Sequence, residues 1–265
     1  MKLSMLYATH DDRLISLIEH LPEAHYNTEI IIIHQTKTSH KYQKYVDFLN
    51  NRKDIRYFSS DDKGVTKSRN LAITKSTGDI LLFCDDDVIY NSDIQKNIIN
   101  AYKENTNAGF LTFAYTEDIN KIKSKKFKEN SFKHTLFTIL SIGTIQISCK
   151  RIPITNFSIK FPEDMGAGSK YFLCDEPVFL SKFIKSRIDG YYIPISIGYH
   201  PKESSGNIFN NKNAFISRLL CFKRIFGNFN GKLLYITYLF KNIKKFHSIH
   251  DFTSAISLIT KREYK

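Results

Sequence analysis

Two short runs of consecutive apolar residues constrain the fold of this chain more than any other feature. Residues 30–33 are four isoleucines in succession, and residues 80–84 read Ile-Leu-Leu-Phe-Cys. An amphipathic helix or a half-exposed strand would instead mix polar with apolar residues at a fixed period. A strand that is apolar on both faces is typical of a parallel sheet covered by helices on both sides. The sequence therefore predicts an α/β fold with a mostly parallel central sheet.

Amphipathic segments alternate with short apolar runs along the first half of the chain, as expected for βαβ units. A first strand is predicted over residues 3–7, and apolar residues follow it at helical spacing. These residues are Leu14, Leu17, Ile18 and Leu21. Further strands are expected over residues 29–34, 55–58, 80–84 and 109–115, and helices over residues 41–49, 65–76 and 91–105.

The pattern changes in the second half of the chain. Residues 144–159 are predicted to be rich in β-structure, and the glycines and proline of residues 161–169 indicate a loop. A helix over residues 175–188 and a strand over residues 191–197 follow, and residues 204–207 are expected to form a flexible joint. Helices are expected beyond this joint over residues 213–226, 232–246 and 251–260.

Three consecutive carboxylates, Asp85, Asp86 and Asp87, directly follow the second buried strand. Ligands of open α/β sheets bind at the carboxyl ends of the strands. Like charges at this spacing repel one another unless a cation holds them, and hard oxygen ligands favour Mg²⁺ or Mn²⁺. Strand spacing places Asp85 and Asp87 on one face, which makes them the better pair of ligands. An acidic loop that only caps the next helix is the alternative.

Three other polar groups could bind a ligand, and each has an ordinary structural alternative. His200 follows the last predicted strand and could complete a metal site or bind phosphate, or it could be a surface residue. Residues 61–70 open a helix, and a basic helix amino terminus near Lys63 suits a diphosphate or is simply solvated. Asp175 and Glu176 begin another helix, where one could be a general base or both could cap the helix.

Taken together, these segments resemble family 2 of the inverting glycosyltransferases, which bind nucleotide sugars with the GT-A fold. The most specific match is a run of motifs in the order and spacing of the family. It comprises Gly64, Ser68-Arg69-Asn70, Gly78-Asp79 and the Asp-x-Asp motif Asp85-Asp86-Asp87. The resemblance covers in outline the part of the chain that ends at residue 205.

The resemblance implies a role for each candidate residue. Asp85 and Asp87 would bind the nucleotide ribose and a metal-diphosphate, with Mn²⁺ or Mg²⁺ screening the leaving group. Glu176 matches the base that deprotonates the acceptor, with Asp175 as the alternative. His200 matches a histidine that completes the metal site in some members. The implied donor-binding residues are Thr9, Gln35, Lys63, Gly64, Arg69, Asn70, Asp85 and Asp86.

One departure from the family pattern concerns recognition of the nucleotide base. Members of the family often have aspartates after the second strand, whereas residues 34–37 of this chain read His-Gln-Thr-Lys. Gln35 can still pair with a uracil or thymine edge because an amide both donates and accepts hydrogen bonds. A UDP-sugar is therefore the expected donor. Thr9 follows Ala8 where relatives carry Pro-Thr-Tyr, which weakens its match to the donor site.

The net charge of +13 is concentrated in the last part of the chain. Residues 207–265 contain eleven lysines and arginines against Asp251 and Glu263, so this segment carries +9 (11 − 2). A second basic cluster lies in a segment that is interpreted as a solvated loop. It comprises Lys121, Lys123, Lys125, Lys126 and Lys128. The expected partners are polyanions, namely a phospholipid surface, nucleic acid or a phosphorylated substrate.

We predict a GT-A domain over residues 1–205 and a basic amphipathic helical tail over residues 206–265. No apolar run reaches the roughly 20 residues of a membrane-spanning helix, and neither a signal peptide nor a disulfide framework is indicated. The tail is expected to bind anionic lipid, with packing on the core as the alternative. The residues proposed for lipid contact are Phe215, Leu219, Phe222 and Phe226 with Arg218, Lys223 and Arg224. The expected location is cytoplasmic, at the inner face of the bacterial plasma membrane.

The resulting hypothesis is a metal-assisted transfer of a sugar, with inversion, to a hydroxyl of a growing surface glycan such as capsule, lipopolysaccharide or a lipid-linked precursor. Residues 161–170 and 201–212 are expected to close over the donor. A sugar-phosphate nucleotidyltransferase is the alternative enzyme, but residues 7–12 lack the glycine-rich loop of that class. A non-catalytic nucleic-acid-binding protein would spread its charge over one groove-facing element. Nucleic acid is therefore not an expected partner.

Overall fold

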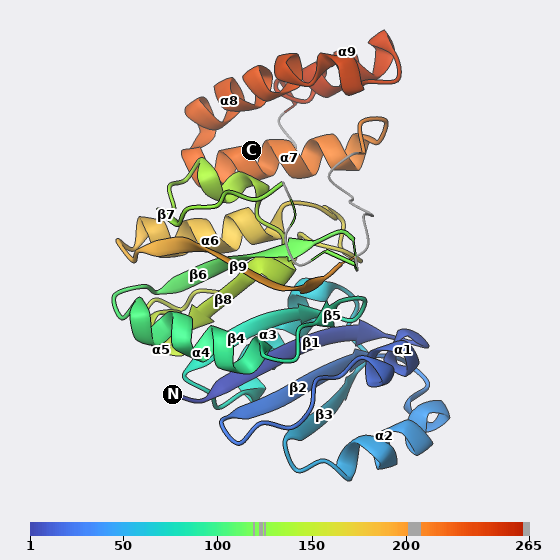
Figure 1. Ribbon diagram of the computed structural model, residues 1–265. Coiled ribbons are helices and arrows are strands. Elements are labelled where there is room, and N and C mark those ends of the chain that lie inside the picture. The colour runs from blue at the N-terminus through green and yellow to red at the C-terminus, as the bar shows by residue number, and fades with distance from the viewer. Residues whose placement is uncertain (119, 122–123, 125, 201–207, 262–265) are drawn as a thin grey trace.

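The computed structural model describes residues 1–118, 120–121, 124, 126–200 and 208–261, and its core is one continuous sheet (Figure 1). The described strands pair in the order β3-β2-β1-β4-β8-β6-β9-β5, and β7 pairs with β9. The strands are β1 (Leu3–His10), β2 (Thr28–Gln35), β3 (Ile55–Ser60), β4 (Ile80–Asp85), β5 (Ile89–Tyr90), β6 (Phe110–Thr116), β7 (Phe132–Lys133), β8 (Ile147–Lys150) and β9 (Gly190–Tyr199).

Helices of very different length connect and cover these strands. The α-helices are α1 (Arg13–Glu19), α2 (Gln43–Asn50), α3 (Val65–Lys75), α4 (Ile94–Glu104), α5 (Arg151–Asn156), α6 (Asp175–Lys185), α7 (Lys212–Phe226), α8 (Asn228–Lys241) and α9 (Ile249–Ser257). The 3₁₀ turns are η1 (Ser39–Tyr42), η2 (Thr138–Ser141), η3 (Thr144–Gln146) and η5 (Ile243–Lys245).

The predicted parallel half of the sheet is confirmed. β1 pairs in parallel with β2 and β4, and β3 extends the sheet beyond β2. The four isoleucines of β2 are at most 1% exposed, as expected for a strand that is buried on both faces. In this register His10 lies opposite Gln35, and Ala8 lies opposite Asp85. The carboxyl ends of three strands and the acidic triplet therefore meet at one edge of the sheet.

The prediction of mainly β-structure over residues 144–159 is wrong for most of that segment. Only β8 is a strand, and it runs antiparallel between β4 and β6. Lys150 lies opposite Ile80, the first residue of β4, so a longer β8 would have no partner on that side. Pro153 also lacks the N–H that a strand ladder requires. The chain turns instead into the short helix α5.

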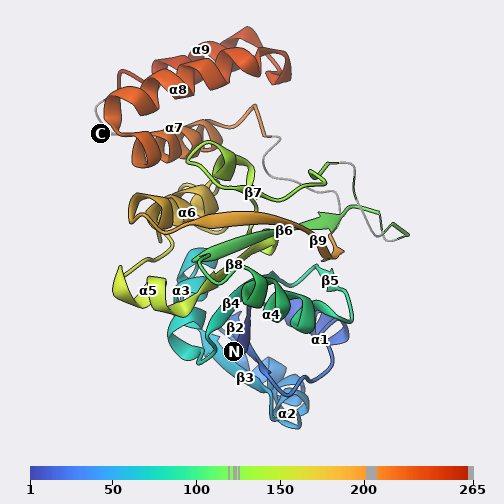
Figure 2. The same cartoon turned by 60° about the vertical axis from the view of Figure 1, so that its left-hand side comes forward.

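Helices cover both faces of the sheet, which gives the protein three α/β/α layers (Figure 2). Successive residues of a strand point to opposite faces. Tyr7 therefore belongs to the core that α1, α2 and α4 complete, and Leu6 belongs to the core that α3, α5 and α6 complete. In the second core the rings of Phe161 and Phe179 stack with their centroids 3.9 Å apart. This packing attaches the loop after α5 to α6.

Helices α7, α8 and α9 form a further layer that lies on α6 (Figures 1 and 2). Ile225 of α7 packs with Met165 and Val178 in one apolar cluster. The Arg224 guanidinium donates from Nη1 to Asp164 Oδ1 at 2.8 Å and also pairs with Oδ2. Apolar packing and a two-point ion pair thus fix this helical layer to the sheet domain.

The apolar side chains of α7 face inward. Phe215, Leu219 and Phe222 are 2%, 1% and 9% exposed and pack in a cluster with α8 and α9. Their predicted role as a lipid-facing surface is therefore wrong, because they hold the helical layer together. The boundary after residue 205 and the joint over residues 204–207 lie outside the described residues, so the two-part division stays a prediction. No described helix is long and apolar enough to cross a bilayer.

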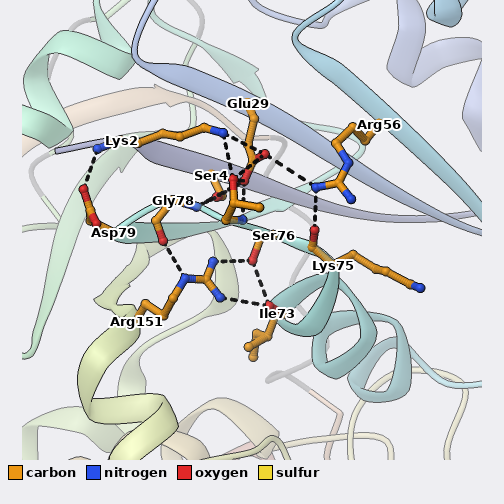
Figure 3. A network of polar contacts seen from close by, with 11 residues as sticks. Lys2, Ser4, Glu29, Arg56, Ile73, Lys75, Ser76, Gly78, Asp79 and Arg151 are labelled. Atoms are coloured by element: carbon orange, nitrogen blue, oxygen red, sulfur yellow. Dashed lines mark hydrogen bonds and ion pairs between the residues drawn. The ribbon is translucent and has the colours of Figure 1, made fainter.

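A buried carboxylate ties the amino-terminal ends of the strands together (Figure 3). Glu29 of β2 is 5% exposed and accepts hydrogen bonds from Ser4 Oγ (2.6 Å) and the Thr77 amide (2.5 Å). Lys2 Nζ lies 3.1 Å from its other oxygen. Burial alone would raise the pKa of Glu29, but these hydrogen bonds lower it to about 2. One ionised side chain therefore joins β1, β2 and the turn before β4.

Gly78 is required in this turn because the backbones approach so closely. A Cβ atom on Gly78 would lie 2.5 Å from Ser4 Oγ and 2.8 Å from the Lys2 carbonyl oxygen. Arg151 supports the turn from the other side by donating to the Gly78 carbonyl and to Ser76 Oγ, both at 2.7 Å (Figure 3). The Gly-Asp motif that precedes β4 is thus explained by packing at the end of the sheet opposite the acidic triplet.

Glu29→Gln should lower the free energy of unfolding by about 2 kcal/mol at neutral pH, the scale of hydrogen bonds to a charged group. The pKa of Glu29 is lower in the folded chain than in the unfolded chain, where a glutamate titrates near 4.3. Its stabilisation is therefore complete above the unfolded pKa and is lost as the pH falls toward about 2. Urea denaturation should show that the difference in free energy of unfolding between wild type and variant is smaller at acid pH than at neutral pH.

The matched control is Glu104→Gln, because Glu104 is exposed on α4. This change should leave the free energy of unfolding nearly unaltered at both pH values. A wild-type minus Glu29→Gln difference that does not change with pH would show that the charge of Glu29 contributes no stability.

Candidate active site

Two cavities lie at the edge where the parallel strands end. The first has a volume of about 690 Å³ and is lined by Ala167 and Gly168 in addition to predicted site residues. Those predicted residues are Thr9, Gln35, Lys63, Arg69, Asp85, Asp86 and Asp87. The second cavity has a volume of about 620 Å³, and Asp85, Glu176 and His200 contribute to its wall. Asp85 therefore lines both cavities.

The three acids of the triplet have different surroundings. Asp86 is 6% exposed, accepts a hydrogen bond from Thr9 Oγ1 at 2.6 Å and forms an ion pair with Arg13. Burial raises the pKa of Asp86, and the Thr9 hydrogen bond and the Arg13 charge oppose that rise. Asp87 is more exposed and lies 3.1 Å from Arg13 Nη2. The Thr9 hydroxyl of β1 and the Arg13 guanidinium of α1 thus hold the Asp86 carboxylate.

Asp85, Asp87 and His200 form a cluster that fits a divalent cation. Each offers one ligand atom, and these atoms lie within 4.8 Å of one another. His200 Nε2 is 3.7 Å from Asp87 Oδ1. Two carboxylate oxygens and an imidazole nitrogen are ligands that Mn²⁺ accepts, and Mg²⁺ favours the two carboxylates. The structure thus brings together the three residues that the sequence assigned to a metal.

A short strand explains why His200 reaches the triplet. In β5, Ile89 lies opposite Tyr199 of β9. The strands are so close that a Cβ atom on Gly198 would lie 2.3 Å from the Ile89 carbonyl oxygen. The His200 amide donates to the Thr116 carbonyl at 2.9 Å, which continues the pairing with β6. A two-residue strand has no detectable periodicity, so the sequence did not predict β5.

Arg69 of α3 connects the end of β4 to the start of α6. It is 5% exposed, and its Nη1 and Nη2 atoms donate to Asp175 at 2.8 Å and to Asp85 at 3.2 Å. Nη1 also lies 3.9 Å from Glu176 Oε1. Carboxylates this close to a buried guanidinium offset the free-energy cost of removing its charge from water. Arg69 lines the first cavity as predicted for a donor-site residue, but its terminal nitrogens are engaged by protein carboxylates.

The two acids at the start of α6 differ in accessibility. Asp175 is 3% exposed; burial and the neighbouring Glu176 raise its pKa, and Arg69 opposes this rise. The side chain of Glu176 is 18% exposed and accepts a hydrogen bond from Thr144 Oγ1 at 2.6 Å. Cys174 adopts a positive φ of 68°, which turns the chain into the helix at this point. Glu176 is therefore the acid of this pair that lines the second cavity.

Three other predicted donor-site residues support the backbone around the first cavity, and of these only Gln35 lines it. The Gln35 amide donates to the Gly64 carbonyl at 2.9 Å and accepts from the Gly64 amide at 3.3 Å, which holds Gly64 at a φ of 119°. Asn70 lies outside the lining and bonds both backbone groups of Phe161, at 2.9 and 3.1 Å. These side chains position the start of α3 and the loop that follows α5.

The structure also identifies site residues that the sequence analysis did not single out. Arg13 forms ion pairs with two acids of the triplet. Its position shortly after the first strand could have indicated that it lies at the site, because the strand ends meet there. Thr144 contacts Glu176 from η3, and no local pattern indicates this contact because it arises from tertiary packing. Of the segments expected to close over the donor, 161–170 contributes Ala167 and Gly168 to the first cavity. Residues 201–207 of the other segment lie outside the described chain.

One family model matches more than half of the chain, and solved structures share its fold. The family model described as Glycosyl transferase family 2 matches residues 11–158. The fold resembles the crystal structure of S. aureus TarS 1-349 in complex with UDP-GlcNAc, with a TM-score of 0.69 and 17% identity over 99% of this chain and 77% of that chain. It also resembles the mannosyltransferase PcManGT from Pyrobaculum calidifontis in complex with GDP-Man and Mn²⁺, with a TM-score of 0.57 and 11% identity over 99% and 81%. No curated protein matches the chain.

Arg69→Met should lower the free energy of unfolding by about 3 kcal/mol at neutral pH, because it leaves buried carboxylates without a counter-charge. Lys67→Met is the matched control on the same helix. Its ion pair with Asp62, at 3.2 Å, lies at the surface and is worth less than about 1 kcal/mol. Urea denaturation of both variants measures the difference. Equal losses would show that burial of the Arg69 pairs adds nothing to their effect on stability.

Proposed function

The chain belongs to glycosyl transferase family 2, and from that membership we propose that it transfers a sugar from a UDP-sugar to an acceptor hydroxyl with inversion at the anomeric carbon. The protein is a glycosyltransferase with the GT-A fold.

The position of Asp85 is the observation that carries this proposal. Asp85 lines both the first cavity, which the strand ends border, and the second cavity, which Glu176 lines. A donor in the first cavity and an acceptor in the second would therefore meet beside Asp85. Structures of the same fold have been solved in complex with UDP-GlcNAc or with GDP-Man and Mn²⁺, which supports a nucleotide sugar as the occupant of the first cavity.

We assign the donor to the first cavity with uracil at its Gln35 side. The Gln35 amide uses both N–H groups, on Gly64 and Ser68, and one oxygen lone pair on the Gly64 amide. The remaining lone pair can accept the imide N–H of uracil. Lys63 lines the same cavity just before the start of α3, where a diphosphate gains from the helix dipole. Thr9 acts indirectly by orienting Asp86.

A divalent cation, Mn²⁺ or Mg²⁺, is proposed as the cofactor. Asp85, Asp87 and His200 would hold it, because their ligand atoms already lie within 4.8 Å of one another. When bound, the cation would neutralise negative charge on the leaving diphosphate.

Glu176 is the proposed general base. Its carboxylate would take the proton of the acceptor hydroxyl while that oxygen forms a bond to the anomeric carbon. The bond from this carbon to the diphosphate oxygen would break on the opposite side, which inverts the configuration. The hydrogen bond from Thr144 holds Glu176 in place. Asp175 is a positioning residue in this scheme because Arg69 already engages its carboxylate.

A growing bacterial surface glycan, such as a capsule or lipopolysaccharide chain, is the proposed acceptor, and contact with the inner face of the plasma membrane is proposed with it. The observation that favours membrane contact is the outer surface of α8. Phe229, Leu233 and Phe240 are 80%, 55% and 55% exposed, and Lys244 and Lys245 follow at the end of the helix. Exposed apolar side chains on α8 and the lysines of η5 directly after it suit an anionic lipid surface.

The reaction is tested by calorimetric titration of UDP-, GDP- and dTDP-sugars with and without Mn²⁺. Wild type should release binding heat with one UDP-sugar only when Mn²⁺ is present. Asp87→Asn should lose this heat because it removes a charged ligand. Glu176→Gln should keep the heat but transfer sugar about 10²- to 10⁴-fold more slowly, the usual contribution of a general base.

Each outcome tests a separate part of the proposal. Heat with a GDP-sugar alone would overturn the assignment of uracil, and equal heat without metal would overturn the cation site. Transfer by Glu176→Gln at the wild-type rate would remove Glu176 from the mechanism.

Membrane contact is tested by sedimentation with vesicles of phosphatidylglycerol and phosphatidylcholine. Replacing Phe229, Leu233 and Phe240 with serine should weaken binding about tenfold or more, because each loses buried apolar area at the lipid interface. The matched control replaces Tyr26 and Phe48 with serine, since they are 90% and 58% exposed and Phe48 belongs to α2, which lies at the other end of the molecule from α8 (Figure 1). Wild-type binding by the α8 variant, or equal binding to pure phosphatidylcholine, would exclude this surface.

A further inference from the structure

The second cavity is lined by part of the mid-chain lysine cluster that the sequence analysis interpreted as a solvated loop. Lys126, Phe127 and Lys128 contribute to its wall together with Glu176 and His200. The described residues of this segment thus lie at the same cavity as the proposed general base. The segment is an exposed loop at Lys126 and Lys128, as predicted, and it also borders this cavity.

Aromatic rings form much of this cavity. The rings of Tyr115 and Phe127 meet edge to face with their centroids 4.9 Å apart, and those of Phe132 and Tyr192 stack at 5.0 Å. All four residues line the cavity. Flat rings offer apolar surfaces to the C–H faces of a ligand, while polar groups between them fix its orientation. Such a lining suits a carbohydrate chain.

The two lysines that line the cavity differ in how far other groups compensate their charge. Lys126 Nζ donates to Glu117 at 2.8 Å and to the Tyr115 hydroxyl at 2.9 Å, so its charge is partly compensated. Lys128 Nζ lies 4.8 Å from the centre of the Phe132 ring. Within the described part of the chain, Lys128 is exposed and forms no ion pair with an acid. Its charge is therefore available to a ligand.

Arg218 adds a third cation to the lining of the cavity. It is 4% exposed and donates to the Ile208 carbonyl at 2.8 Å while stacking on Phe209. The lining of the cavity therefore combines the acids Asp85 and Glu176 with the lysines Lys126 and Lys128. A ligand that carries both a hydroxyl and a negatively charged group would find a complementary partner for each.

We propose that the second cavity binds the acceptor and that the acceptor is an anionic glycan, with a phosphate or carboxylate group held at Lys128 and Lys126. This inference rests on the proposed function for the direction of the acceptor, whose hydroxyl would face Glu176. Phosphate and uronate groups share the chemistry that two lysines recognise, since both accept charge-assisted hydrogen bonds from an ammonium group.

The test is a calorimetric titration of the full chain, without donor, with three oligomers of similar length. They are a glycerol phosphate oligomer, an oligogalacturonate and a neutral malto-oligosaccharide. At least one anionic oligomer should bind about tenfold more tightly than the neutral one, a difference of about 1.4 kcal/mol. The stronger of the two anionic oligomers identifies the charged group as phosphate or carboxylate.

Lys128→Glu should remove this preference, whereas Lys121→Glu should keep it. Lys121 belongs to the same basic cluster but pairs with Asp118 at 2.7 Å and does not line the cavity. The pair of variants also controls for binding of polyanions to the basic tail, which neither change alters. Equal affinity for all three oligomers, or equal loss in both variants, would overturn the inference.

The titration also separates this inference from the proposed function. Donor heat without a preference for anionic oligomers would overturn only the anionic acceptor. A preference that depends on Lys128 without any donor heat would support the cavity assignment and overturn the sugar transfer.

Discussion

Arg69 lies where carboxylates from two distant parts of the chain converge, and the arrangement of the site depends on its charge. Asp85 ends β4 and Asp175 begins α6, and each forms a hydrogen bond with the same buried guanidinium. In a region of low dielectric these acids would repel one another or take up protons. Arg69 lets them stay close without a ligand. It also leaves Glu176, 3.9 Å from the same guanidinium, as the more accessible acid.

The sequence was most informative where burial is uniform. Four consecutive isoleucines allow few structures besides a strand buried on both faces, and the parallel pairing that follows brings Gln35 and Asp85 to one edge. It was least informative where pairing direction changes. The end of β8 is determined by where β4 begins, and the two residues of β5 are determined by β9. Such boundaries depend on the partner strand, and the sequence of the strand itself carries no information about that partner.

Side-chain roles were harder to predict than side-chain positions. The family resemblance implied donor-binding roles for Gln35 and Arg69, and both line the first cavity. It did not show that Gln35 braces Gly64, or that Arg69 bonds acids from two elements. The apolar residues of α7 gave a similar error, because an amphipathic helix looks the same in sequence whether lipid or another helix covers it. Phe215 and Leu219 face helices of the same chain.

If Asp85, Asp87 and His200 hold a cation as proposed, the pairing of β5 with β9 would link cation binding to the closure of the last strands of the sheet. His200 follows β9, which pairs with the last strand of the sheet, β5, whereas Asp85 ends β4 and Asp87 lies in the turn between β4 and β5. A ligand that contacts all three would bridge these segments and would be released if the edge opened. By mass action, an ion that binds only the closed edge also favours the closed edge. The cation would then stabilise the pairing of the last strands of the sheet, in addition to neutralising charge on the substrate.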